Sequence, residues 1–189
     1  RMWQLDPLQI PNRYTNSPVW STAETQLHCN IYHLFSTRMR RIIIAIYKLP
    51  LWKSIIILIL LSYIIPILIP QISNTPRPNM LNETLFFGFY AILLAPLMET
   101  FTGQILPYYI LKETFGCKVI GISICSGIIF GLYHLYSPDY AVHAGIVGCL
   151  YQLWYIVYKK HYSDFKAFLI ISSVHALHNS VAFLLNYLH

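Results

Sequence analysis

Long apolar stretches that hold almost no charge interrupt this chain, and they constrain its fold more than any other feature. A helix needs about 20 apolar residues to cross the hydrocarbon core of a bilayer. Five stretches approach or exceed that length, at residues 51–70, 84–111, 119–136, 140–158 and 165–187. Charged residues make up only 11% of the chain, whereas ordinary soluble domains have about 25%. The sequence therefore predicts an all-α fold, a polytopic transmembrane helical bundle of about five spans.

The basic residues gather on one side of these predicted spans. If the segment before the first span is cytoplasmic, ten flanking cations lie on that side and only Arg77 lies on the other. The ten are Arg38, Arg40, Arg41, Lys48, Lys53, Lys112, Lys118, Lys159, Lys160 and Lys166. This bias follows the positive-inside rule. We expect an integral membrane protein in a lipid bilayer with a cytoplasmic N-terminus, and the net charge of +6 then calls for no nucleic-acid partner.

The polar and apolar segments predict three parts. Residues 1–38 hold three prolines among polar residues without a sustained period, so we expect a tail that is disordered or non-native. Residues 39–82 carry the basic segment and the first span, and residues 83–189 carry the other four. An aromatic cluster within the fourth span, just before Lys159, suits an interfacial belt. Its members are Tyr151, Trp154, Tyr155 and Tyr158.

Glu99 is the only acidic residue well inside a predicted span. A charge near the bilayer centre costs about 2.5–3.5 kcal/mol on insertion scales, so such a group faces a protein interior or a wet cavity. Pro96 and Pro107 are expected to weaken the helix around it. The carboxylate either pairs with another group to hold helices together or serves a function.

Two further spans carry histidines at helical spacing. His134 ends the run FGLYH in the third span, four residues after Phe130, so the two share a face. In the same span Gly127 and Gly131 form a small-xxx-small pair that admits a close neighbouring helix. In the fifth span His175 and Asn179 also share a face, and His178 is less well aligned with that pair. Each motif alone could serve only to hold helices together through interhelical hydrogen bonds.

Together, these side chains have few other partners inside the lipid, so we expect them to meet. A carboxylate with two imidazoles can activate a water molecule and stabilise a tetrahedral intermediate. The same set is close to the ligands of a catalytic zinc site. Both kinds of chemistry remain open on the residues alone.

The order of these motifs resembles the CPBP (CAAX protease and bacteriocin-processing, or Abi) family of intramembrane proteases, which is related to the eukaryotic Ras-converting CAAX endopeptidase. That family carries Glu-Glu-x-x-x-Arg, Phe-x-x-x-His and His-x-x-x-Asn or Asp, each on its own transmembrane helix. The second and third motifs match Phe130 to His134 and His175 to Asn179. In the first, Glu99 takes the place of the first Glu, while Thr100 and Gln104 replace the second Glu and the Arg. A neutral hydrogen-bonded pair can there replace an ion pair.

The resemblance covers about residues 83–187 and implies a role for each matched position. Glu99 and His134 would activate the attacking water, and His175 and Asn179 would stabilise the oxyanion. Thr100, Gln104 and Phe130 would support them. The family is described as glutamate-dependent and metal-independent, so no metal or other cofactor is predicted.

The implied activity is hydrolysis of a peptide bond in a membrane-associated peptide or protein, at the plasma membrane of a microbe. Nothing in the sequence identifies the substrate or a prenyl group. Two alternatives remain open: a metal-dependent membrane hydrolase with Glu99, His134 and His175 as ligands, and a non-catalytic bacteriocin-immunity or scaffold protein of the same fold.

Overall fold

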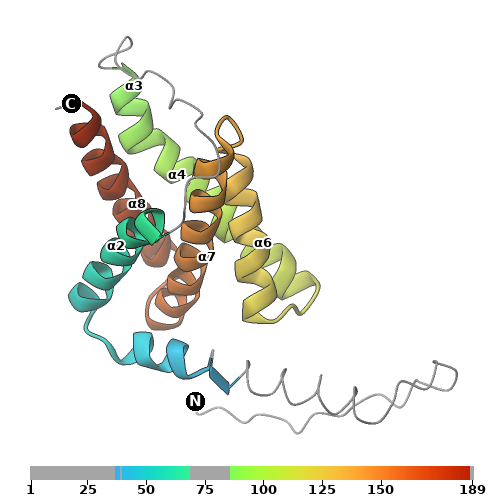
Figure 1. Cartoon of the computed structure of the whole chain (residues 1–189). Helices are drawn as coiled ribbons and strands as arrows, with labels where there is room; N and C mark the ends of the chain where they lie inside the picture. Colours follow the sequence, from blue (N-terminus) through green and yellow to red (C-terminus); the bar gives the residue numbers. More distant parts are fainter. Residues whose placement is uncertain (1–36, 39, 69–85, 188–189) are drawn as a thin grey trace, which may run out of the picture. The chain divides into compact units, whose positions relative to one another are not determined.

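The computed structural model describes residues 37–38, 40–68 and 86–187, and every regular element within them is a helix (Figure 1). The predicted all-α class is therefore confirmed. The predicted tail at residues 1–38 falls almost wholly outside the described residues, as does the segment 69–85 that holds Arg77. The described residues from 41 onward belong to one compact unit. Its longer helices are α2 (Leu51–Leu68), α6 (Val119–Leu132), α7 (Pro138–His161) and α8 (Asp164–Tyr187).

The second predicted span is a single helical rod that alternates between α and π turns. Its segments are α3 (Phe86–Phe89), η2 (Tyr90–Leu94), α4 (Ala95–Thr100), η3 (Phe101–Ile105), α5 (Leu106–Tyr108) and η4 (Tyr109–Thr114). Pro96 and Pro107 are each the second residue after a π segment. A π turn lets a helix continue past a proline that cannot donate a hydrogen bond. The expected weakening is thus a local widening of the helix.

A side chain from another helix replaces the donor that Pro96 lacks. The backbone N–H of Ala95 donates to Tyr90 O, five residues back, and residue 96, next in this pattern, has no N–H. Ala91 O instead accepts from Nδ2 of Asn179 on α8, at 2.8 Å.

One π segment later, the Leu106 N–H donates to Phe101 O, five residues back, so the carbonyl that Pro107 leaves open in this pattern is that of Thr102. The next carbonyl, that of Gly103, accepts from the hydroxyl of Ser126 on α6. The rod is therefore joined to α8 at the carbonyl that Pro96 leaves open and to α6 at Gly103 O.

Helices α6 and α7 lie side by side and touch through glycines (Figure 1). A Cβ atom built on Gly131 would lie 2.7 Å from Ala141 O, and one on Gly145 would lie 3.2 Å from Gly127 O. A Cβ on Gly148 would lie 2.5 Å from Cβ of Phe130. The close approach predicted from the small-xxx-small pair is confirmed, and it places Phe130 directly against α7.

Helix α7 packs against α2, α6 and α8, and its aromatic residues lie in the core. Tyr151, Trp154, Tyr155 and Tyr158 are all buried. The predicted interfacial belt is therefore wrong, because these rings face neighbouring helices. Two of them reach Ser54 of α2: Nε1 of Trp154 donates to its Oγ at 2.9 Å, and the Tyr158 hydroxyl lies 3.0 Å from that Oγ.

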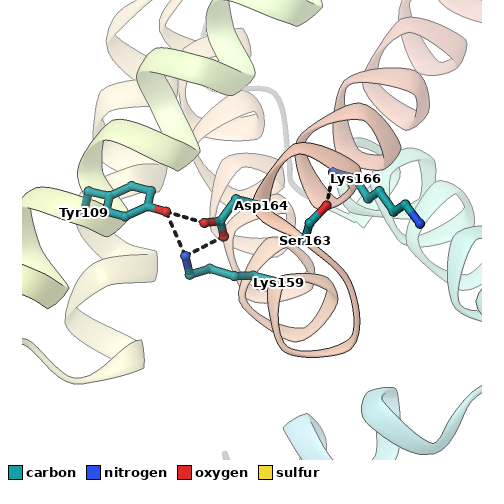
Figure 2. A network of polar contacts seen from close by, with 5 residues as sticks. All are labelled: Tyr109, Lys159, Ser163, Asp164 and Lys166. Carbon is teal, nitrogen blue, oxygen red and sulfur yellow. Dashed lines mark hydrogen bonds and ion pairs between the residues drawn. The ribbon is translucent and has the colours of Figure 1, made fainter.

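A polar cluster joins the rod to the connection between α7 and α8 (Figure 2). Lys159 Nζ lies 2.5 Å from Asp164 Oδ1 and donates to the Tyr109 hydroxyl at 2.9 Å. The Tyr109 hydroxyl donates in turn to the other carboxylate oxygen of Asp164. Nζ also lies 4.5 Å from the centre of the Tyr109 ring, which adds a cation–π contact. One end of η4, the C-terminus of α7 and the N-terminus of α8 therefore meet.

Two of the described helices, α7 and α8, are long and apolar enough to cross a membrane. The apolar parts of α2 and α6, Leu51–Ile65 and Val119–Leu132, are shorter. At 1.5 Å per residue, the 14 residues of α6 extend about 21 Å, whereas the hydrocarbon core is about 30 Å thick. The number of spans stays a prediction.

Candidate active site

Glu99 and His175 face each other from two helices. Glu99 lies on α4, between two π segments, and His175 lies on α8. Oε2 of Glu99 is 3.7 Å from Nε2 of His175, and the two side chains are 21% and 5% exposed. That distance is slightly too long for a direct hydrogen bond. The structure thus brings together the acid and one of the two imidazoles that the sequence singled out.

His134 lies in the turn that follows α6, two residues beyond the end of the helix. The predicted third span therefore ends earlier than residue 136, but the rings of Phe130 and His134 still lie on one face and stack. Its backbone N–H donates to Gly131 O at 2.9 Å, and its ring Nδ1 is 2.9 Å from Phe130 O. Because a carbonyl only accepts, Nδ1 carries the hydrogen and Nε2 keeps its lone pair in the neutral ring. The side chain thus caps α6 and remains buried.

Phe130 is the ring around which both histidines pack. Its centroid lies 5.6 Å from that of His134, on which it stacks with planes 28° apart, and 5.2 Å from that of His175. Tyr151 of α7 closes the cluster, at 5.5 Å from His175 and 6.0 Å from Phe130. The predicted supporting residue thus contacts both imidazoles.

Asn179 reaches the site from the next turn of α8. One N–H of its amide is used by Ala91 O, which leaves a second N–H and a carbonyl oxygen. The amide therefore joins the rod to α8, and its second N–H is not used in that bond.

Thr100 and Gln104 are fully buried on the rod. When the Gln104 amide is oriented with its nitrogen toward acceptors, Nε2 donates to Thr100 O at 3.2 Å and to Glu99 O at 3.3 Å. Gln104 thus supports the backbone of the turn that carries Glu99. The side-chain pair expected between Thr100 and Gln104 is replaced by these bonds to carbonyls.

A cavity of about 350 Å³, its open mouth included, adjoins this cluster. Four of the residues predicted for the site line it: Phe130, His134, His175 and Asn179. The other lining residues are Ser62, Tyr140, His143, Ala144, Val147, Tyr151 and His178. Glu99 does not line the cavity. It approaches the lining residues at His175.

Sequence reasoning missed the contribution of α2, whose Ser62 lines the cavity. The only signal was the position of His178, one residue before Asn179.

In the part of the chain that the structure describes, no three His, Cys, Asp or Glu side chains are grouped as ligands of one metal ion. The zinc alternative therefore gains no support from the arrangement of Glu99, His134 and His175. What the residues offer is a carboxylate beside an imidazole, with lone pairs and N–H donors around a small cavity.

Comparison with known proteins agrees with the motifs. The curated proteins gave no match, and neither did the solved structures. The family described as type II CAAX prenyl endopeptidase Rce1-like matches residues 81–181, more than half of the 189 residues. This range includes Glu99, His134, His175 and Asn179 and excludes α2. The chain therefore belongs to the Rce1-like family of type II CAAX prenyl endopeptidases.

Proposed function

We propose that this protein is an intramembrane endopeptidase in which Glu99 activates water to hydrolyse a peptide bond of a membrane-associated peptide or protein. The observation that carries the proposal is the 3.7 Å approach of Glu99 Oε2 to His175 Nε2, from two different helices, beside the cavity. Membership of the family makes a protease the expected class of enzyme. The carboxylate supplies the general base that this chemistry needs.

In the proposed reaction, Glu99 takes a proton from a water molecule as its oxygen attacks the scissile carbonyl carbon. Nε2 of His134, whose other nitrogen is held by Phe130 O, accepts a hydrogen bond from the second hydrogen of that water. N–H groups of His175 and Asn179 stabilise the oxyanion of the tetrahedral intermediate. When the C–N bond breaks, Glu99 returns its proton to the leaving amine. The products are a new carboxylate and a free amine.

The proposed setting is a bilayer crossed by about five helices, with the N-terminus in the cytoplasm of a microbe. The contact of Lys159 with Tyr109 supports this orientation, because it joins η4 to the end of α7. Lys112 on η4 and Lys160 on α7 then lie toward the same end of the bundle. Cations concentrated at one end suit the cytoplasmic face.

A cleavage assay tests the proposed function. The protein would be reconstituted in vesicles with an internally quenched, farnesylated CAAX peptide, the substrate class that the family description suggests. Glu99→Gln keeps the size of the side chain and removes the base, so we expect a loss of turnover of about 10²–10⁴-fold. Glu113→Gln, which changes an exposed carboxylate on the same rod, is the matched control and should keep full activity.

Retained turnover in the Glu99→Gln protein would contradict the proposal. If neither the parent nor the control cleaves the peptide, while both fold and insert, the non-catalytic scaffold becomes the better account.

A further inference from the structure

His178 also borders the cavity, and it joins α8 to α2. Nδ1 of His178 lies 3.0 Å from Oγ of Ser62. The His178 ring also stacks on Tyr63, with centroids 4.4 Å apart and planes 17° from parallel. The Tyr63 hydroxyl donates to the backbone carbonyl of His178 at 2.8 Å. These three contacts come from two adjacent residues of α2, so the ring has little freedom to rotate.

The proton positions in this contact follow from the second partner of the serine. The hydroxyl of Ser62 lies 2.8 Å from Ile59 O, which can only accept, so the single hydroxyl hydrogen is used there. Oγ must then accept from His178. The hydrogen of the neutral imidazole therefore sits on Nδ1, and Nε2 bears the lone pair.

The cavity wall thus has a hydrogen-bond acceptor that the proposed chemistry does not use. His178 and Ser62 line the same cavity as His134, His175 and Asn179. An extended peptide entering an apolar site brings backbone N–H groups that need acceptors, because an unpaired buried N–H is costly. The lone pair of a neutral, fixed imidazole meets that need.

We propose that His178 contacts the substrate, with Nε2 accepting a hydrogen bond from a backbone N–H of the bound peptide. Ser62 is its positioning residue, since it fixes the tautomer and the ring plane. The inference rests on the proposed function, because it takes a peptide as the ligand. It also makes α2, which lies outside the matched residues 81–181, part of the substrate site.

Peptide binding in a protein that cannot cleave tests this directly. In the Glu99→Gln background, the Kd of the farnesylated CAAX peptide would be measured by fluorescence anisotropy in vesicles. His178→Phe keeps a ring to stack on Tyr63 and removes both nitrogens, so Kd should rise about three- to tenfold. Ser62→Ala frees the tautomer and should raise Kd by a smaller factor.

Ser54→Ala is the matched control. It removes another buried serine of α2, eight residues earlier, that bonds to Trp154 and Tyr158 away from the cavity. Its Kd should match that of the background protein. Unchanged binding after His178→Phe would overturn the inference, as would equal weakening by the two serine variants, or no binding to the background protein at all.

A spectroscopic measurement keeps the test independent of cleavage and of the substrate chosen. Nitrogen-15 NMR of labelled histidines, with the His178 signal identified by its loss in His178→Phe, reports which ring nitrogen carries the hydrogen. We expect Nδ1–H in the parent and a shift toward Nε2–H in Ser62→Ala. Nε2–H in the parent would overturn the inference. If the parent fails to cleave but His178→Phe weakens binding, the proposed hydrolysis fails and the role of His178 stands.

Discussion

The glycine contact between α6 and α7 provides a prediction whose size follows from the structure. In Gly131→Ala the new Cβ would lie 2.7 Å from Ala141 O, a backbone atom that cannot swing away. To reach an ordinary contact of 3.4 Å, the two helices must separate locally by about 0.7 Å. Overpacking of this kind costs about 1–3 kcal/mol.

The separation would also disturb the site. Gly131 follows Phe130 directly, and its carbonyl accepts the backbone N–H of His134. A misplacement of about 1 Å can cost about 10²-fold in rate. We therefore expect Gly131→Ala to lower both stability and turnover.

Thermal unfolding in detergent and the cleavage assay measure the two effects. Gly121→Ala is the matched control, because this glycine lies on the same helix, is exposed, and a Cβ there would touch nothing within 4 Å. Alanine in an exposed helical position should be neutral or stabilising by up to about 1 kcal/mol. The reasoning is refuted if Gly131→Ala unfolds and cleaves like the parent, or if Gly121→Ala is equally harmful.

Three further changes test other contacts. Asn179→Leu leaves Ala91 O without its donor and should lower the unfolding free energy by about 1–3 kcal/mol. Denaturation in mixed micelles measures this loss. An unchanged unfolding free energy would show that the π turn is stable without a side-chain donor to Ala91 O. Ser126→Ala removes the donor to Gly103 O and should cost a similar amount, again about 1–3 kcal/mol, in the same titration. Asp164→Asn breaks the ion pair with Lys159, in which the Asp164 side chain is 44% exposed. The unfolding free energy should therefore fall by only about 0.2–1 kcal/mol, and the loss should shrink as salt is added. A large loss that does not depend on salt would contradict a solvent-screened pair.

The sequence predicts the helices well because long apolar runs leave a chain few alternatives. It misplaces the end of α6: residues 133–136 are mostly apolar, and the first clear break is Ser137 with Pro138, which starts α7. The structure ends α6 earlier, at a turn where the His134 side chain bonds to Phe130 O, and composition does not reveal such a bond.

The sequence also cannot decide which face an aromatic residue takes. Tyr155 and Trp154 precede Lys159, as residues of an interfacial belt would, yet they are buried because α7 is central. Only the packing of α2, α6 and α8 around α7 distinguishes the two environments.

The candidate site is partly predictable for a related reason. Glu99 and His175 stand out because polar groups in apolar helices need partners, and the structure brings them together. The π turns do not stand out, since they depend on donors from Ser126 and Asn179 on other helices. The contact of Ser62 with His178 joins residues 116 positions apart, and no local spacing encodes it.

The central claim is that Glu99 and His175 act as one unit on a peptide bond. A double-mutant cycle on kcat, with Glu99→Gln, His175→Gln and both together, tests it most directly. Groups that act together lose most of their contribution when either is removed. We expect each single change to cost about 10²–10⁴-fold and the double change to cost little more. Losses that multiply in the double variant, or near-normal kcat in either single variant, would contradict the claim.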